Sequence, residues 1–467
     1  MVVYKSSNEH KFNRGDLVKT MHIAFGFDIF YPETNGVITS TINLARNLID
    51  MGHKVWFFVP DNKGFQDNTI ENGIQIVHIK AMASGIYKGM KIIPIYGWYL
   101  YPYLKKYKID IVHNTSPWLM GMSLNHAARR LHIPSIATHH TLIDNPIYIK
   151  YALKSETLSY AAQDAIWRVV FNPFYKLTWI ATAPNKATCR QVSEKFPGLD
   201  VRYISNGIDV SRFDDSRPIL PLPKSIPEKW LGPNTLLYVG RLGYEKAIDV
   251  TFDAFSICLR HNPNAKLIII GRGPAENMLK RQIAKLKIED SVLMTGLIPN
   301  DQIIGSRVLE RVAAFVTASL SENQAITVIE ALCSGAPVIC ANVENMTTLV
   351  HPDQGWYFRG GDIYDLASKM EEAITNRELQ QEKAHNAAKS RPLFDGRNVA
   401  KEFVKTYEDM LSMKESGFYV AKGKERAERY MLSREEKAEL KEMSKKERKA
   451  ELKALKKKEK KDRKSLV

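Results

Sequence analysis

Short, almost wholly apolar runs alternate along the first half of the chain with segments whose apolar residues recur every three or four positions. The apolar runs lie at residues 22–27, 55–59, 74–79, 109–113, 135–138 and 179–183. Between the first two runs, residues 38–49 have the helical spacing, and Gly52 follows as a stop signal. Strands that are apolar on both faces and alternate with helices predict a parallel sheet covered on both sides.

The same pattern restarts in the second half of the chain and predicts a second sheet. Apolar runs lie at residues 235–240, 266–271, 292–295, 313–318 and 338–341, with a helical pattern at residues 247–259 and another at 399–411. A proline-rich stretch at residues 214–233 indicates either a linker or an elaborated first loop of this half. The predicted fold class is α/β, with two Rossmann-like, doubly wound parallel-sheet domains.

Two glutamates form the most informative pattern in the chain. Glu322 lies just before an apolar-periodic helix and Glu330 lies eight residues later, within it. A helix start leaves backbone N–H groups free, and these groups attract phosphate. Eight residues of helix rise about 12 Å, close to the separation of the two sugars that flank a diphosphate. The carboxylates could then bind hydroxyl groups at both ends of a nucleotide sugar; for the pair alone, a solvated helix face is the alternative.

Cationic and glycine-containing loops follow other predicted strands. Arg241 and Lys246 lie in Gly-Arg-Leu-Gly-Tyr-Glu-Lys, where both side chains can reach one anion, as a diphosphate site needs. Gly273 lies in Gly-Arg-Gly-Pro after the next strand, which alone is weak evidence. Gly36, after Asn35, would let the backbone approach a ligand. These loops are expected at the carboxyl ends of parallel strands, where open α/β sheets bind ligands.

Composition restricts the class of protein. The 467 residues are 44% hydrophobic and 10% aromatic, as in a folded chain of two domains. No apolar run is long enough to span a membrane, and residues 1–20 lack the apolar core of a secretory signal. The four cysteines at 189, 258, 333 and 340 lack CxxC spacing, so we expect reduced thiols in a cytosolic protein. Residues 441–467 hold 13 Lys and Arg against 5 Asp and Glu, so this basic tail carries half of the net +16.

The segments FDIFYPETNGVITSTINLARNLIDMGHKV, GRLGYEKAIDV, IIIGRGP and SLSENQAITVIEALCSGAPVI resemble the retaining glycosyltransferases of family four. The resemblance covers roughly residues 21–411 and implies the GT-B fold, in which two Rossmann-like domains face each other across a cleft. Thr138-His139-His140-Thr141, the region of Asp144 and Tyr148, and the Glu-Asn-Gln beginning at Glu322 look most like bacterial 1,2-diacylglycerol 3-glucosyltransferases.

The resemblance implies a role for each matching residue. Arg241 and Lys246 would bind the diphosphate, Glu322 the transferred hexose and Glu330 the ribose. His140 would contact the hexose near its reacting carbon. Backbone groups would also bind the phosphate of the donor. The residues that would provide them are Gly36, Gly273, Ala325, Ile326 and Thr327.

Two positions depart from the family pattern. Family members usually have Gly at the position of Ala325 and often at that of Ala247. Each alanine adds a methyl group close to the expected phosphate path, and a requirement for positive φ at either position would strain the site. This departure keeps a non-catalytic binding module among the alternatives.

The expected chemistry is a front-side transfer without a metal. No Asp/Glu pair suits the nucleophilic mechanism of hydrolases, so positioning and electrostatic stabilisation would supply most of the rate. No DxD-like motif ends a strand, and no metal is expected. UDP-glucose is the predicted donor, although the sequence does not distinguish the hexoses or uracil from guanine.

Lipid is the expected partner surface. The basic tail at 424–467 could bind anionic lipid or could be a solvated extension, and it lacks the interleaved aromatic residues of a nucleic-acid site. The aromatic and lysine-rich segment at 92–108 suits a membrane interface or a core helix with a basic end. Diacylglycerol is the predicted acceptor, which would place the enzyme on the cytoplasmic face of the membrane.

The resemblance also implies a division of the chain. A polar extension (1–20) precedes an acceptor-binding domain (21–205), which helix 397–413 completes; a nucleotide-sugar-binding domain (206–396) and a basic helical tail (414–467) follow. The alternatives are transfer to a cell-wall polymer, polysaccharide or protein, a non-catalytic module, and, less favoured, a nucleotide-sugar epimerase.

Overall fold

The computed structural model of the chain describes residues 19–28, 30, 36–60, 73–83, 91–93, 97–140 and 165–417. Several predictions concern residues outside these ranges. They are most of the N-terminal extension, Asn35, the region of Asp144 and Tyr148, and the basic tail at 424–467.

The first half of the chain forms a seven-stranded parallel sheet in the order β3-β2-β1-β6-β7-β8-β9. The strands are β1 His22–Gly26, β2 Lys54–Pro60, β3 Gln75–Ile79, β6 Ile111–Asn114, β7 Ser135–Thr138, β8 Ile180–Ala183 and β9 Asp200–Tyr203. The α-helices are α1 Gly36–Asp50, α2 Tyr101–Lys106, α3 Leu119–Arg130, α6 Asn172–Leu177 and α7 Lys186–Lys195, and a π-helical segment covers Trp167–Phe171. The short strands β4 Met82–Ala83 and β5 Lys91–Ile92 pair separately and antiparallel.

The second half forms a six-stranded parallel sheet in the order β12-β11-β10-β13-β14-β15. The strands are β10 Gly232–Val239, β11 Lys266–Ile270, β12 Val292–Gly296, β13 Val312–Thr317, β14 Val338–Ala341 and β15 Gly355–Phe358. The helices are α8 Ile248–His261, α9 Glu276–Leu286, α10 Asn300–Gly305, α11 Ile326–Ser334, α12 Glu344–Thr347, α13 Ile363–Thr375 and α14 Arg377–Ala388. Helix α15 spans Gly396–Glu415.

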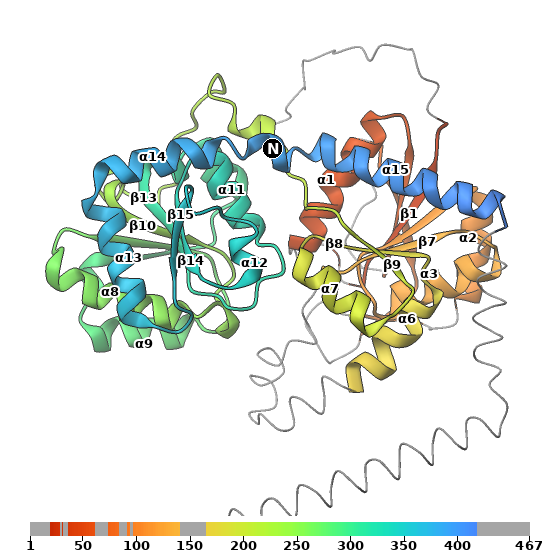
Figure 1. The fold of residues 1–467 in the computed structure, drawn as a ribbon, viewed down its shortest axis with the longest axis horizontal. Helices are drawn as coiled ribbons and strands as arrows, with labels where there is room; N and C mark the ends of the chain where they lie inside the picture. The colour runs from red at the N-terminus through yellow and green to blue at the C-terminus, as the bar shows by residue number, and fades with distance from the viewer. Residues whose placement is uncertain are drawn as a thin grey trace, which may run out of the picture. The chain divides into compact units, whose positions relative to one another are not determined.

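Helices cover both faces of the six-stranded sheet, as its apolar strands predict. Alternate residues of the strands pack on one side against α8, α9 and α13 and on the other side against α10, α11 and α14. Figure 1 shows α8, α9 and α13 together along one side of this sheet. The two hydrophobic clusters account for strands that are buried on both faces.

Besides the short pair β4 and β5, two strands of the large sheets were not predicted from the hydrophobic pattern. Strand β9 lies at the edge of its sheet, and none of its four residues is fully buried, so its sequence Asp-Val-Arg-Tyr lacks an apolar run. Strand β15, Gly-Trp-Tyr-Phe, is the edge strand of the other sheet. The proline-rich stretch at 214–233 contains the 3-10 turn Glu228–Trp230 and ends as β10 begins at Gly232.

The start of helix α15 lies close to α1, although more than 340 residues separate the two helices in the sequence (Figure 1). A Cβ atom built on Gly396 would lie 2.8 Å from Asn47 Nδ2 of α1. The side chains of His113 on β6 and Tyr407 on α15 share a hydrogen bond of 2.7 Å. The segment before α15 also pairs with Ile208, whose N–H donates to Phe394 O at 2.9 Å.

Candidate functional site

The loop after β13 and the start of α11 carry the Glu322–Glu330 motif. Helix α11 begins only at Ile326, after Ala325 in an extended conformation, and it ends at Gly335 with φ 80°. The prediction that Glu330 lies inside the helix is confirmed. The two glutamates are not joined by eight residues of helix, because residues 322–325 precede α11. The helical rise of about 12 Å therefore does not apply to this stretch.

The first amides of α11 are placed to meet a ligand. Ile326 and Thr327 have no carbonyl group one helical turn earlier to accept from their N–H groups, and both residues are only partly buried. A Cβ atom built on Gly36, the first residue of α1, would lie 3.7 Å from Ile326 Cγ1. The N-termini of α1 and α11 therefore lie close together, and both helix dipoles favour an anion there.

The loop after β10 places two cations against two carboxylates. Lys246 Nζ donates to Glu322 Oε1 at 2.6 Å, and both side chains are largely buried. Arg241 Nη2 donates to Glu245 Oε1 at 2.6 Å; the arginine is half exposed, whereas the glutamate is buried. A Cβ atom on Gly243 would lie 2.6 Å from Glu245 Cδ, so the glycine leaves room for that carboxylate. The structure thus brings Lys246 to Glu322 and adds Glu245, which sequence reasoning missed.

Gly273 has a structural reason to be glycine. A Cβ atom there would lie 2.6 Å from the carbonyl carbon and 2.7 Å from the nitrogen of Leu242, both of them backbone atoms. The loop after β11 therefore packs directly on the loop that carries Arg241. Gly271, with φ 148°, makes a similar close approach to the backbone of Gly240. These glycines hold the two loops together, whether or not they contact a ligand.

Glu330 is a buried carboxyl group held by polar neighbours. Asn300 Nδ2 lies 3.1 Å from both carboxylate oxygens, and Arg212 Nη1 lies 4.0 Å from one of them. Burial raises the pKa of Glu330 to about 7, and Arg212 and Asn300 only partly offset this effect. A carboxyl group with this pKa changes its charge close to neutral pH.

His139 and His140 follow β7 and have different surroundings. The backbone carbonyl of His139 accepts from Asn323 Nδ2 at 2.7 Å, and its ring shares a 2.6 Å hydrogen bond with Tyr175. Burial lowers the pKa of His139 to about 4. Burial, with a smaller contribution from His139, lowers the pKa of His140 to about 3, so both rings are neutral at physiological pH.

Asn323 and Gln324 connect the motif to residues of the first half of the chain. Besides its bond to His139, Asn323 accepts from Thr188 Oγ1 at 2.9 Å. Gln324 accepts from the N–H of Asn206 at 2.7 Å and donates to Ser205 Oγ at 2.9 Å. The sequence identified Glu-Asn-Gln only as a point of family likeness and gave Asn323 and Gln324 no role. Their position directly after Glu322 was the only sequence feature that could have indicated such a role.

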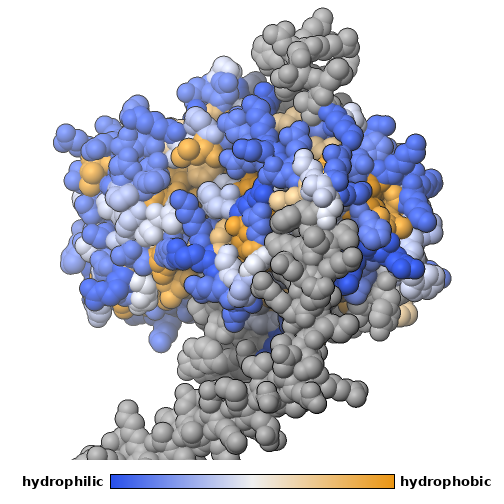
Figure 2. Space-filling model, turned by 45° about the vertical axis from the view of Figure 1, so that its right-hand side comes forward, coloured by the Kyte–Doolittle hydropathy of each residue, from blue (hydrophilic) through white to orange (hydrophobic). Residues whose placement is uncertain are grey.

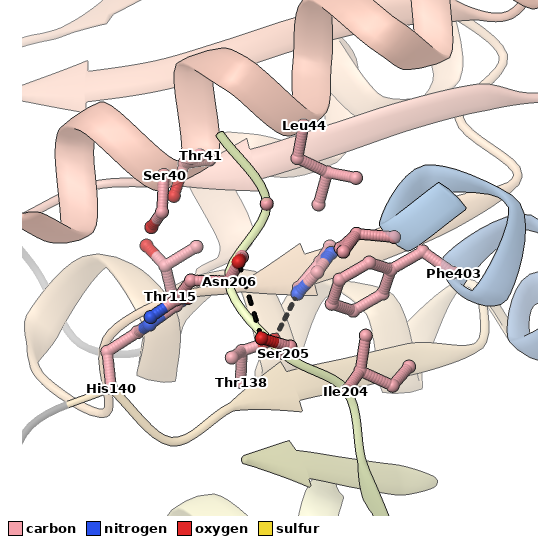
Figure 3. Close-up of a pocket in the computed structure, with 13 residues that line it drawn as sticks. Ser40, Thr41, Leu44, Thr115, Thr138, His140, Ile204, Ser205, Asn206 and Phe403 are labelled. Atoms are coloured by element: carbon pink, nitrogen blue, oxygen red, sulfur yellow. Dashed lines mark hydrogen bonds between the residues drawn. The ribbon is translucent and has the colours of Figure 1, made fainter. Parts of the chain in front are cut away.

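A pocket lies next to His140, with an empty volume of about 320 Å³ that is partly open to solvent. Helices α1 and α15, the ends of β6 and β7, and the segment after β9 form its walls. Figure 3 shows Ser40, Thr115 and His140 on one side and Phe403 on the other. Its described lining residues are Ser40, Thr41, Leu44, His113, Thr115, Thr138, His140, Ile204, Ser205, Asn206, Gly207, Val399 and Phe403.

Metal-binding clusters and membrane-spanning helices are both absent from the residues that the structure describes. No group of three or more His, Cys, Asp or Glu side chains among them could hold a metal ion. Among the same residues, no helix is both long and apolar enough to cross a membrane.

Comparisons with known proteins agree with this architecture. The family model described as glycosyltransferase family 4 matches residues 34–212, and the one described as glycosyl transferases group 1 matches residues 224–390. The alpha-monoglucosyldiacylglycerol synthase of Streptococcus pneumoniae is 28% identical over 358 residues, which are 76% of this chain and 78% of the relative. The synthase of the same name from Acholeplasma laidlawii is 25% identical over 328 residues, 68% of this chain and 80% of the relative.

Solved structures show the same fold. Anabaena HepE in complex with UDP-glucose has a TM-score of 0.65 at 17% identity, and the match covers 83% of this chain and all of that one. Sucrose-phosphate synthase from Thermosynechococcus elongatus has a TM-score of 0.66 at 18% identity, covering 84% and 99%. The chain has two parallel sheets and a motif loop at the start of α11, and two family models match successive parts of its sequence. It is a glycosyltransferase of family four with the GT-B fold.

Proposed function

We propose that this glycosyltransferase transfers glucose from UDP-glucose to diacylglycerol with retention of configuration, at the cytoplasmic surface of the membrane. One observation carries the proposal: Lys246 and Glu322 meet at 2.6 Å beside the amino end of α11, and Glu330 lies within that helix. This arrangement provides a cation and free amides for a diphosphate and carboxyl groups for hydroxyls. Two relatives are alpha-monoglucosyldiacylglycerol synthases, which supports the choice of acceptor.

Each half of the chain has a part in this proposal. Residues 206–396 would bind the nucleotide sugar, and residues 21–205 with helix 397–413 would bind the acceptor. Glu322 would hold the hexose and Glu330 the ribose. The solved structure of HepE with UDP-glucose supports a donor of this class.

The transfer is a front-side displacement. The bond from the anomeric carbon to the diphosphate oxygen breaks, and the acceptor oxygen forms its new bond on the same face of the sugar. The acceptor proton moves to a phosphate oxygen. Arg241 and Lys246 offset the negative charge that grows on the leaving diphosphate, which is a large electrostatic contribution to the rate. Because these two cations supply the charge, we expect full activity in EDTA; loss of activity that Mg²⁺ restores would contradict this expectation.

A lipid surface would bind near α2. Trp98 is 65% exposed, and Tyr103 is partly exposed on the helix that ends in Lys105 and Lys106. Leu104 of the same helix is buried, so this helix has one face in the core and one in solvent. Aromatic and basic side chains of this kind suit a membrane interface. Figure 2 shows other hydrophobic patches on the face in view, each small and surrounded by hydrophilic residues.

The test is transfer of radiolabelled glucose from UDP-glucose to mixed vesicles that contain diacylglycerol. We expect labelled glycolipid, and at least about a 100-fold lower rate in Lys246→Ala, as when one transition-state charge partner is removed. Lys285→Ala, on an exposed face of α9, is the matched control and should not change the rate.

Other outcomes of this experiment would identify the alternatives. Label that appears only in polymer or protein would mean the same donor chemistry on another acceptor. UDP-glucose binding without turnover would indicate a non-catalytic module. Unchanged turnover in a folded Arg241→Ala/Lys246→Ala double variant would refute the proposed diphosphate site.

A further inference from the structure

The pocket beside His140 presents hydroxyl oxygens whose hydrogens are already engaged. Thr41 Oγ1 and Ser40 Oγ both donate to Val37 O, at 2.7 and 3.0 Å. Thr115 Oγ1 donates to Gly26 O at 3.2 Å. Each of these oxygens keeps lone pairs that can accept a hydrogen bond. This part of the wall therefore offers acceptors to a ligand.

The other polar groups of the pocket include both engaged groups and donors. Ser205 Oγ donates to a neighbouring backbone carbonyl at 3.4 Å and accepts from Gln324 Nε2 at 2.9 Å. Both ring nitrogens of His113 are engaged, with Tyr407 at 2.7 Å and Thr138 at 2.6 Å. The Asn206 amide and the neutral His140 ring can donate. A hydroxyl group, which both donates and accepts, complements such a wall.

The described lining residues carry no formal charge at physiological pH. None of the thirteen is Lys, Arg, Asp or Glu. Burial is the main cause that lowers the pKa of both His113 and His140 to about 3, so neither imidazole is a cation. Among the described lining residues, a phosphate would find no cationic partner and an ammonium group would find no carboxylate. Either charge would lose its hydration without compensation.

We propose that this pocket holds the uncharged, hydroxyl-bearing end of the acceptor and excludes acceptors with a phosphate at that end. The inference rests on the proposed function, because His140 connects the pocket to the transferred hexose. The pocket is narrow and partly open to solvent, so only the end of a ligand would lie in it. Leu44, Val399 and Phe403 would contact the carbon skeleton.

The first test compares two lipids that both have a free hydroxyl group. Vesicles containing equal fractions of monoacylglycerol or of lysophosphatidic acid, in which a phosphate replaces the terminal hydroxyl group, are incubated with radiolabelled UDP-glucose and the full-length chain. We expect transfer to monoacylglycerol to be at least ten times faster. Thr115→Val keeps the shape of the side chain but removes the acceptor oxygen, and should raise the KM for diacylglycerol about tenfold. Ser40→Ala is the second variant if Thr115→Val does not fold.

Thr375→Val is the matched control, because the Thr375 hydroxyl also donates to a backbone carbonyl, at 2.8 Å, but lies on an exposed helix face. It should leave both KM and kcat unchanged. Equal use of the two lipids would overturn the proposal, and so would an unchanged acceptor KM in both Thr115→Val and Ser40→Ala.

A binding measurement separates this inference from the proposed function. Glycerol and sn-glycerol 3-phosphate are titrated into the UDP-bound protein while the imidazole signals of His140 are followed by NMR. Shifts with glycerol alone would support the pocket assignment even if no lipid were glucosylated, in which case the proposed lipid acceptor would have failed. Equal or stronger shifts with the phosphate would overturn the pocket assignment.

Discussion

Gly36 allows the proposed donor site to be tested without damage to the fold. It is the first residue of α1, and its φ lies outside the left-handed region that favours glycine. Among the residues that the structure describes, a Cβ atom built there would make one ordinary contact, at 3.7 Å from Ile326 Cγ1. The unliganded protein therefore has room for alanine at this position. The added methyl group would lie between the amino ends of α1 and α11, where we place the diphosphate.

Gly36→Ala should leave the stability of the unliganded protein unchanged or raise it, but should lower the affinity for UDP. Alanine is favoured over glycine by about 0.8–1.0 kcal/mol inside a helix and by less at its first position, so the unliganded variant should be as stable as the parent or up to about 1 kcal/mol more stable. We expect UDP to bind at least tenfold more weakly, a loss of about 1.4 kcal/mol. At a UDP concentration 100 times the parent Kd, the ligand's stabilisation should fall from about 2.7 to about 1.4 kcal/mol.

The assay is urea unfolding with and without UDP, together with direct calorimetry of UDP binding. Arg46→Ala, on an exposed position of the same helix, is the control and should bind UDP as the parent does. Parent-like UDP affinity in a folded Gly36→Ala variant would refute the placement of the diphosphate between the two helix starts. A large loss of stability without ligand would show instead that the protein itself requires glycine there.

Three other residues lead to predictions with different measurements. Gly273→Ala should lower the free energy of unfolding in urea by about 1–3 kcal/mol, because the new methyl group meets the fixed backbone of Leu242; parent-like stability would contradict this packing argument. Asn323→Ala should lower kcat with little change in donor KM, because it releases the backbone of His139 from the residue beside Glu322; an unchanged kcat would show that this contact does not position the reacting groups. The pKa of Glu330 is raised from 4.5 to about 7 in the folded protein, so the protonated carboxyl group stabilises the fold. This stability is fully present below pH 4.5 and is lost as the pH rises through 7. Relative to Glu330→Gln, the parent should therefore lose up to about 1.4 kcal/mol of stability per pH unit in that range while its UDP affinity rises; parallel stability profiles would refute the shift.

The hydrophobic pattern predicted the sheets because their strands are buried on both faces. Residues 135–138, for example, were predicted as a strand and form β7 with the same bounds. Strand β9 was missed because an edge strand with no fully buried residue needs no apolar run. Pattern reasoning depends on burial, so it fails where hydrogen bonds alone hold a strand in the sheet.

The candidate site was predictable only as far as residue types and spacing indicate chemistry. Lys246 and Glu322 were both selected, but the ion pair that joins them across 76 positions could not be derived from either motif. Glu245 looks like a solvated acid in the sequence, whereas the structure buries it against Arg241 and over Gly243. The hydrogen bond from Asn323 to His139 joins residues 184 positions apart. Such contacts depend on how separate segments of the chain pack together, which no local pattern specifies.

The two departures from the family pattern acquire different meanings in the structure. Ala325 has φ −75°, so alanine is unstrained there, and its methyl group packs against the cluster around α11. Ala247 has φ 49° and ψ 42°, a left-handed conformation that costs a non-glycine residue about 1–2 kcal/mol. Its methyl group packs against the cluster around α8, which offsets part of that cost. Because both methyl groups contact the hydrophobic core, the alanines affect backbone stability more than the space for phosphate. These substitutions therefore give no steric support to a non-catalytic module.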